Sequence, residues 1–203
     1  NGYHRLATVL GRRSWYSLPL GKPSPIVFPN IFWGKHAVFL NEVGGIPTNV
    51  FFEIQPRRGI DPKVLCAILN STLAAIFVEL SGRYIENRDR TLSNQMMVYE
   101  LERLPVIHPE KLGQLKQELE KCFDTNLDIE IPSTVSRGTD SFLLSVDKII
   151  LCDLLGFSPA EMVRIRKSLS SIVEERLKSS DDSAQKINSE ARFVSTTVRD
   201  RDD

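Results

Sequence analysis

The sequence lacks any run of about 18 apolar residues, so it predicts no membrane-spanning helix. Its first residues, "NGYHRLATVLGRRS", lack the apolar segment of a secretory signal peptide. They also lack an initiator methionine, which suggests a piece of a longer chain. The 203 residues, of which 41% are hydrophobic, are enough to bury one core or two small ones.

Cysteine and histidine are too few and too scattered for a metal site. The three cysteines, Cys66, Cys122 and Cys152, form no CxxC pair, which argues against zinc and against a disulfide framework. Their apolar neighbours predict buried thiols in a reducing compartment. The histidines match no metal-binding spacing; they are His4, His36 and His108.

Catalytic motifs are also missing. The sequence contains no GxSxG elbow, no phosphate-binding P-loop and no protein-kinase motif set. Glu79, Glu86 and Asp89 could pair for acid–base chemistry, but arginine pairing or a solvated face explains them more simply. We therefore predict no catalytic residue in this chain.

The net charge is zero, yet basic and acidic residues are segregated along the chain. Residues 1–60 contain 7 basic and 2 acidic side chains, whereas residues 109–203 contain 14 basic and 18 acidic ones. A basic N-terminal part beside an acidic C-terminal part is compatible with a surface that binds a polyanion. Chance segregation over a solvated surface is the other interpretation.

Short aromatic and β-branched runs, separated by Gly, Pro and Asn, predict strands in the first 57 residues. They cover residues 13–18, 25–32, 36–41 and 49–56. In the last run Val50, Phe52 and Ile54 share one face.

A buried helix is predicted next, because Asp61 can cap free N–H groups and Pro62 fits the first helical position. Residues 62–80 are apolar on almost every side, which predicts one helix that Gly82 ends. The helix includes the polar triplet of residues 70–72, "NST". Local capping or packing is the simpler interpretation of this triplet, and ligand contact is the alternative.

Residues 83–95 are expected to form a polar loop, and residues 96–107 a strand. Helices are predicted over residues 109–123, 140–157 and 158–178, the last opened by a capping box of Ser158 and Glu161. The predicted fold class is α+β: a β-rich N-terminal half with one buried helix, followed by a helical C-terminal part. We expect residues 109–178 to pack on residues 1–108, and the polar residues 179–203 to be loosely held.

Several side chains could bind nucleic acid. Arginine clamps phosphate or reads guanine, aromatic rings stack on bases, and amides read adenine. The candidate DNA-binding residues are Arg12, Arg13, Trp15, Tyr16, Lys22, Lys35, Arg57, Arg58, Arg83, Asn87, Arg88 and Arg90, with Asn94 and Gln95 as further amides. Packing in a core is the alternative for Trp15 and Tyr16, since large rings dominate cores.

The order of several segments resembles one family. "RRSWYSL", "PNIFWGKHAVFLNE", "FFEIQP", "VLCAILNSTLAAIFVELSGR" and "YELERLPVIHP" follow one another as in the C-terminal target-recognition region of adenine-N6 DNA methyltransferases of restriction–modification systems. The later "LLSVDKIILCDLLGFSPAEMVRIRKSLSSIVEERLKSS" resembles the helical tail of such chains, so the resemblance covers about residues 12–178. The chain departs from it at "RYIENRDRTLSNQ", where many relatives have a glycine-rich link.

This resemblance implies that residues 1–108 form a target-recognition domain that binds double-stranded DNA beside an upstream catalytic domain. S-adenosylmethionine would be the cofactor of that parent enzyme, and no cofactor is expected in this segment. The catalytic [DNS]PP[YFW] motif of the family is missing, because the chain contains no Pro-Pro pair, so the segment should be inactive alone. A nuclease domain as a further partner and the prokaryotic cytoplasm as the location are also implied.

Two other classes of function stay open at this point. A protein-interaction module would dock another subunit through the acidic helical half, residues 109–178. A small separate enzyme would use carboxylates in a cleft, and activity of the fragment alone would distinguish it.

Overall fold

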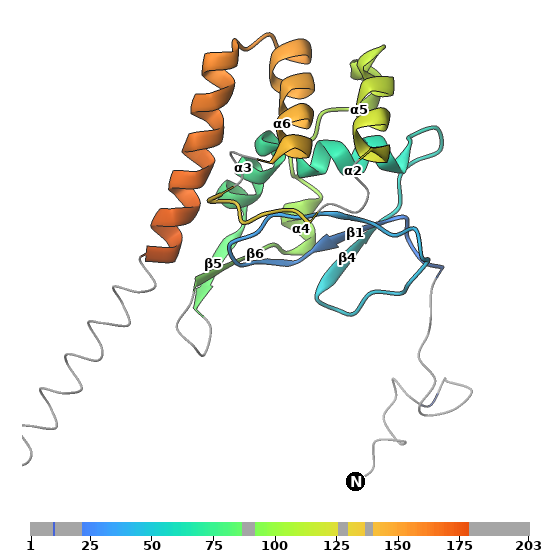
Figure 1. Cartoon of the computed structure of the whole chain (residues 1–203). Coiled ribbons are helices and arrows are strands. Elements are labelled where there is room, and N and C mark those ends of the chain that lie inside the picture. Colours follow the sequence, from blue (N-terminus) through green and yellow to red (C-terminus); the bar gives the residue numbers. More distant parts are fainter. Residues whose placement is uncertain (1–9, 11–21, 87–91, 126–129, 137–139, 179–203) are drawn as a thin grey trace, which may run out of the picture.

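The computed structural model describes residues 10, 22–86, 92–125, 130–136 and 140–178. Two small antiparallel sheets form in the N-terminal half and helices fill the C-terminal half, which confirms the α+β class. The larger helices lie together on one side of the two sheets (Figure 1).

The first sheet has the strand order β3-β1-β4. Its strands are β1 (Ile26–Pro29), β3 (Phe39–Leu40) and β4 (Phe51–Ile54). Ile26 pairs with Ile54 and Phe28 with Phe52, and all four side chains join the hydrophobic core. This confirms the shared face predicted for Phe52 and Ile54, whereas Val50 lies just before the strand and is 43% exposed.

The second sheet has the order β2-β6-β5. Its strands are β2 (Ile31–Phe32), β5 (Arg83–Glu86) and β6 (Leu92–Gln95). The chain passes from one sheet to the other at Asn30. The Asn30 N–H donates to the Val50 carbonyl at 3.0 Å, and the Asn30 carbonyl accepts from the Met96 N–H at 2.8 Å. The single strand predicted over residues 25–32 is therefore divided between two sheets.

The prediction of a polar loop over residues 83–95 is wrong, because residues 83–86 and 92–95 pair as an antiparallel hairpin. Arg83 pairs with Gln95 and Glu86 with Leu92. The strand predicted over residues 96–107 is also wrong, since α4 (Val98–Leu101) is a short helix. The Glu100 carboxylate accepts from the Met97 N–H at 2.8 Å, and this local bond favours the helical turn.

The predicted buried helix is in fact two helices, α2 (Pro62–Asn70) and α3 (Thr72–Ser81), bent by 65°. Asp61 caps α2, since its carboxylate accepts from the Lys63 N–H at 2.7 Å, as predicted. Ser71 has an extended backbone, and its hydroxyl accepts from the Ala74 N–H at 3.2 Å. A new N-terminal cap at Ser71 thus ends one helix and begins the next.

Asn70, the first residue of the polar triplet, binds the backbone of Val38 through its side-chain amide, as a neighbouring strand would do. Its side-chain oxygen accepts from the Val38 N–H at 2.9 Å, and its side-chain nitrogen donates to the Val38 carbonyl at 2.8 Å. Together with the Ser71 cap, these bonds confirm capping and packing as the role of the triplet.

In the described residues, the helical half is built from four short elements and one longer helix. They are a 3-10 helix η2 (Pro109–Leu112), α5 (Leu115–Asp124), α6 (Ser141–Asp147), a π-helix η4 (Lys148–Leu154) and a C-terminal helix over residues 159–178. The predicted capping box is confirmed: the Ser158 N–H donates to the Glu161 carboxylate at 2.8 Å, and the Glu161 N–H donates to the Ser158 hydroxyl at 3.3 Å. Gly156, with φ +77°, separates η4 from the C-terminal helix.

One hydrophobic core joins the first sheet to α2, α5 and α6. Of the cysteines, Cys66 is buried in this core, and Cys122 and Cys152 are partly buried free thiols. Within the described residues no single helix is long and apolar enough to cross a membrane, and only the bent pair α2–α3 passes that test jointly.

Candidate nucleic-acid interface

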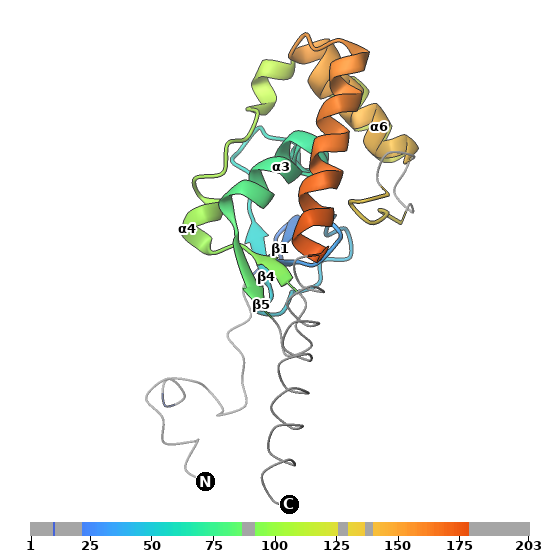
Figure 2. The ribbon, with the colours of Figure 1, turned by 90° about the vertical axis from the view of Figure 1, so that its left-hand side faces the viewer.

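The β5–β6 hairpin is the element that carries most of the predicted loop residues. Arg83 begins β5, and Asn87, Arg88 and Arg90 belong to the connection between the strands, which lies outside the described residues. All four residues of β5 are exposed. The lower end of the C-terminal helix lies beside the hairpin in both views (Figures 1 and 2).

A buried ion pair joins this helix to α3, and the same arginine also contacts the hairpin. The Arg176 guanidinium donates from Nε and Nη2 to the two carboxylate oxygens of Glu79 in α3, each at 3.1 Å. Its Nη1 donates to the Leu92 carbonyl of β6 at 2.8 Å. The guanidinium also lies 5.7 Å from the ring centre of Tyr84 in β5. Arg176 therefore contacts both strands of the hairpin from a side chain that is 1% exposed.

This pair explains Glu79, which the sequence offered as a possible acid–base group. Pairing with arginine was the simpler interpretation, and the structure confirms it. Glu86 is exposed at the end of β5, and Asp89 lies outside the described residues. Tyr84 is 49% exposed, and its partial burial, followed by the nearby Glu79 charge, raises the pKa of its hydroxyl.

Asn94 does not read adenine as the sequence suggested, because its side chain is fully buried. Its side-chain nitrogen donates to the Val78 carbonyl at 3.0 Å and to the Glu79 carboxylate at 3.3 Å. A β-carbon on Gly82 would lie only 1.7 Å from the Asn94 side-chain oxygen, so this approach requires glycine. Asn94 thus fixes β6 to the end of α3. Gln95, the other amide proposed, is partly exposed at the end of β6.

Arg83 lies on the surface but is already engaged by α4. Its Nε donates to the Glu100 carboxylate at 2.9 Å, and its guanidinium lies 5.3 Å from the Tyr99 ring centre. The side chain is still 56% exposed. These contacts hold the guanidinium on the outer face of the hairpin, where it can reach a phosphate.

Arg57 and Arg58 occupy a tight turn between β4 and α2. The Ile60 N–H donates to the Arg57 carbonyl at 3.0 Å, and Gly59 adopts φ +90°. That conformation suits glycine at the third position of a type II turn. Both arginine side chains project from this turn as exposed residues.

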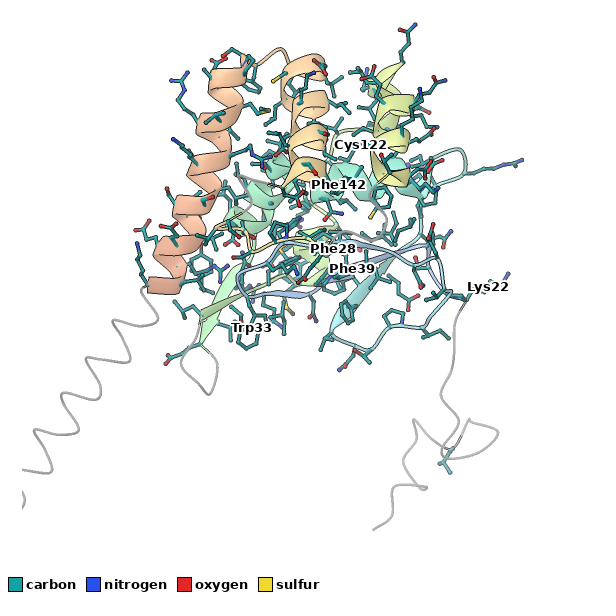
Figure 3. All side chains as sticks on the ribbon, viewed as in Figure 1. Lys22, Phe28, Trp33, Phe39, Cys122 and Phe142 are labelled. Atoms are coloured by element: carbon teal, nitrogen blue, oxygen red, sulfur yellow. The ribbon has the colours of Figure 1, made fainter. Side chains whose placement is uncertain are left out.

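Lys22 and Lys35 are exposed lysines in different places. Lys22 lies at one end of the sheets, far from Trp33 beside the hairpin (Figure 3). The Lys35 ammonium lies 3.1 Å from the Glu130 carboxylate, in a solvent-exposed pair.

The structure does not gather the predicted residues into one cluster. The turn before α2 and the hairpin lie at opposite ends of the molecule (Figure 1). Arg12, Arg13, Trp15 and Tyr16, like the three residues of the hairpin connection, lie outside the described residues. Within the described part, no group of three His, Cys, Asp or Glu residues could hold a metal ion.

Exposed aromatic residues in or directly next to the strands are a feature that the sequence did not reveal. Trp33 is 48% exposed and Phe39 49% exposed. Trp33 directly follows β2 and Phe39 begins β3, and each is exposed next to a buried neighbour, Phe32 and Val38 respectively. A continuous aromatic run such as "NIFWG" gives no sign of which ring faces solvent.

A second buried ion pair fixes the middle of the C-terminal helix. Asp147 of α6 pairs with Arg166 and accepts from the Thr72 N–H at 2.7 Å and from the Thr72 hydroxyl at 2.6 Å. This carboxylate therefore satisfies a free N–H at the start of α3.

A protein-family model matches part of the chain. No curated protein and no solved structure matches the chain significantly. The matching family is described as the C-terminal domain of the Type II methyltransferase M.Eco57I, and the match spans residues 1–85. These residues include α2, α3 and most of β5. Residues 1–85 thus match the M.Eco57I C-terminal domain family, and this match fits a C-terminal region of a restriction–modification methyltransferase.

Proposed function

We propose that this chain recognises a DNA sequence for an S-adenosylmethionine-dependent adenine-N6 DNA methyltransferase whose catalytic domain lies outside it. The match of residues 1–85 to a Type II methyltransferase C-terminal domain carries this proposal. Such a domain is linked to a catalytic methyltransferase domain, so the chain needs no active site of its own.

The surface chemistry supports DNA as the ligand. Exposed arginines occur on the hairpin, at Arg83, and in the turn before α2, at Arg57 and Arg58. Their separation suits phosphate contacts spread along a duplex, since such contacts set the position of a protein on DNA. The predicted Asn87, Arg88 and Arg90 would meet base edges from the connection between β5 and β6.

In this proposal the parent enzyme transfers a methyl group from S-adenosylmethionine, bound in the catalytic domain, to N6 of a target adenine. That base must leave the duplex to reach the methyl donor. The present chain would hold the neighbouring duplex in register while the catalytic domain receives the base. The basic residues would supply affinity, and the hairpin would supply sequence discrimination.

The first test is fluorescence anisotropy of a mixed-sequence duplex with the 203-residue chain at about 50 and 200 mM salt. Phosphate contacts release counterions, so binding should weaken steeply over this range. Replacing Arg57 and Arg58 with alanine should weaken binding and reduce the salt slope by about 1 for each lost phosphate contact. Arg164→Ala is the matched control, because Arg164 is an exposed arginine on the C-terminal helix.

The result also separates the rival classes. Loss of affinity in the control as large as in the Arg57→Ala/Arg58→Ala variant would remove the turn from the interface. No binding of the duplex at low salt, together with salt-insensitive binding of a purified methyltransferase domain, would favour an interaction module built on residues 109–178.

A further inference from the structure

We propose that Arg176 is a positioning residue that fixes the orientation of the β5–β6 hairpin, and thereby sets which DNA sequence the chain selects. This inference rests on the proposed function. Arg176 cannot touch DNA, because its side chain is 1% exposed. It acts through the strands on which it packs.

One guanidinium links three elements at this point. It binds Glu79 of α3 through two parallel hydrogen bonds, donates to the Leu92 carbonyl of β6 and lies over the Tyr84 ring of β5. Leu92 is the first residue of β6, directly after the connection that carries the predicted base-reading side chains. The restraint therefore acts where β6 begins and on the strand that pairs with it.

Glu79 extends the restraint to the centre of the hairpin. Its carboxylate accepts from Asn94, which pairs with Tyr84 across the ladder. The closeness of Gly82 to the Asn94 side chain leaves no space in which β6 could shift toward α3. Together these residues form an anchor of Glu79, Gly82, Asn94 and Arg176 under the hairpin.

Besides this anchor, the hairpin is oriented at its surface by Arg83, which contacts Glu100 and Tyr99 of α4. The hairpin's second neighbour, β2, contributes only two residue pairs to β6. A two-stranded ribbon is marginal in water unless it packs against another element. Here the packing element includes the C-terminal helix, which ends the described part of the chain.

Affinity and sequence selection depend on this orientation to different degrees. Phosphate contacts act through charge and tolerate small shifts of a flexible side chain. Base readout depends on paired hydrogen bonds of fixed geometry, which a moving hairpin would lose. Loosening the anchor should therefore reduce sequence preference more than total affinity.

The second buried ion pair on the same helix supplies a matched control. We compare the charge-neutral double variants E79Q/R176M and D147N/R166M in the 203-residue chain. Each removes a buried ion pair between the C-terminal helix and an earlier element. The first pair contacts the strands of the hairpin through Leu92 and Asn94, whereas Asp147 of the second pair binds Thr72 at the start of α3.

The first readout is amide hydrogen exchange without DNA. In E79Q/R176M the amides of β5 and β6 should exchange roughly tenfold faster than in the wild type, because local opening becomes easier. In D147N/R166M the exchange rates of the β5 and β6 amides, divided by those of the core amides, should change by less than about twofold. Equal exchange of the hairpin in E79Q/R176M and the wild type would overturn the positioning role, whether or not the chain binds DNA.

The second readout is selection from a pool of duplexes randomised at their centre. The wild type should enrich a defined sequence, and E79Q/R176M should enrich a less biased pool while its Kd for a mixed-sequence duplex changes by less than about twofold at low salt. R176K keeps the positive charge but lacks the planar guanidinium, so the sequence bias of its enriched pool should lie between those of the wild type and E79Q/R176M. An unchanged bias in E79Q/R176M, or an equal loss in D147N/R166M, would refute the inference.

The two readouts also separate the inference from the proposed function. A wild-type chain that binds no duplex at low salt contradicts the proposed function. The exchange data then still decide whether Arg176 orients the hairpin.

Discussion

The single variant Arg166→Met should be less stable than the double variant D147N/R166M, which also removes the charge of the partner of Arg166. The partner, Asp147, is 0% exposed on its side chain, and Arg166 is 7% exposed. In Arg166→Met the Asp147 carboxylate would stay buried without its guanidinium. Breaking a buried pair in this way costs about 3–5 kcal/mol.

Two hydrogen bonds from Thr72 remain in that variant, so the lower end of the range, about 3 kcal/mol, is expected. In D147N/R166M the buried charge is gone, and the asparagine oxygen can still accept from the Thr72 N–H. The double variant should then lose only about 1–2 kcal/mol, the cost of weaker hydrogen bonds.

Urea unfolding followed by circular dichroism measures both values. With a slope of about 2 kcal/mol per M, the single variant should shift the midpoint down by about 1.5 M and the double variant by about 0.5–1 M. Lys167→Met, at the exposed neighbouring position, should change stability by less than about 0.5 kcal/mol. A double variant as unstable as the single one would refute the reasoning, because the loss would then not arise from an unpaired buried charge.

Three further predictions concern other sites. Gly82→Ala should lower the free energy of unfolding in urea by about 1–3 kcal/mol, because the new β-carbon would lie 1.7 Å from the side-chain oxygen of Asn94 in β6. Gly34→Ala is the control and should cost clearly less, since the nearest atom to its β-carbon would be 3.6 Å away. Equal losses in the two variants would contradict the prediction. Burial raises the pKa of the Cys66 thiol from 9.0 to about 12. The unfolded chain therefore loses this proton first, and the stability of the fold should fall as the pH rises from 9 toward 12. Cys66 should also resist alkylation in the folded chain, and rapid labelling of the native protein at about pH 8 would contradict its burial. Replacing Arg12 and Arg13 with alanine should weaken duplex binding and flatten its salt dependence, and unchanged anisotropy would remove both from the interface.

Local chemistry made several boundaries of the fold predictable. The caps at Asp61 and at Ser158 with Glu161 depend on atoms within three residues of each other, and the structure confirms both. The break at Ser71 could not be predicted, because the apolar segments on both sides of residues 70–72 continue the pattern of one helix. The serine cap can be recognised in the sequence, but burial of Asn70 and Thr72 against Val38 and Asp147 makes the bend favourable.

The hairpin could not be predicted from the polar sequence of residues 83–95. Its strands are held by tertiary contacts, above all the burial of Asn94 against α3 and the bond from Arg176 to Leu92. These partners lie 16 and 84 positions away in the sequence. Strand propensity depends on such neighbours more than on the residues themselves.

The spacing of residues in the C-terminal helix does indicate that two arginines are buried. Met162, Arg166, Leu169, Val173 and Arg176 recur at spacings of three and four, and all are at most 7% exposed. Arginine in the apolar stripe of a helix is expected to have a buried partner, because an unpaired charge there is unfavourable. The pattern indicates two ion pairs, although it cannot name Asp147 and Glu79 as the partners.

The family match and the physical structure end in different places. The match stops at residue 85, inside β5, whereas the partner strand of β5 and the arginine that anchors it come from residues 92–95 and 176. Residues 1–85 alone would leave Glu79 buried without its guanidinium, and β5 without a neighbouring strand in the described sheet. The region after residue 85 is therefore required to complete the second sheet, and changes there can alter how the hairpin is presented even when the matched residues stay the same.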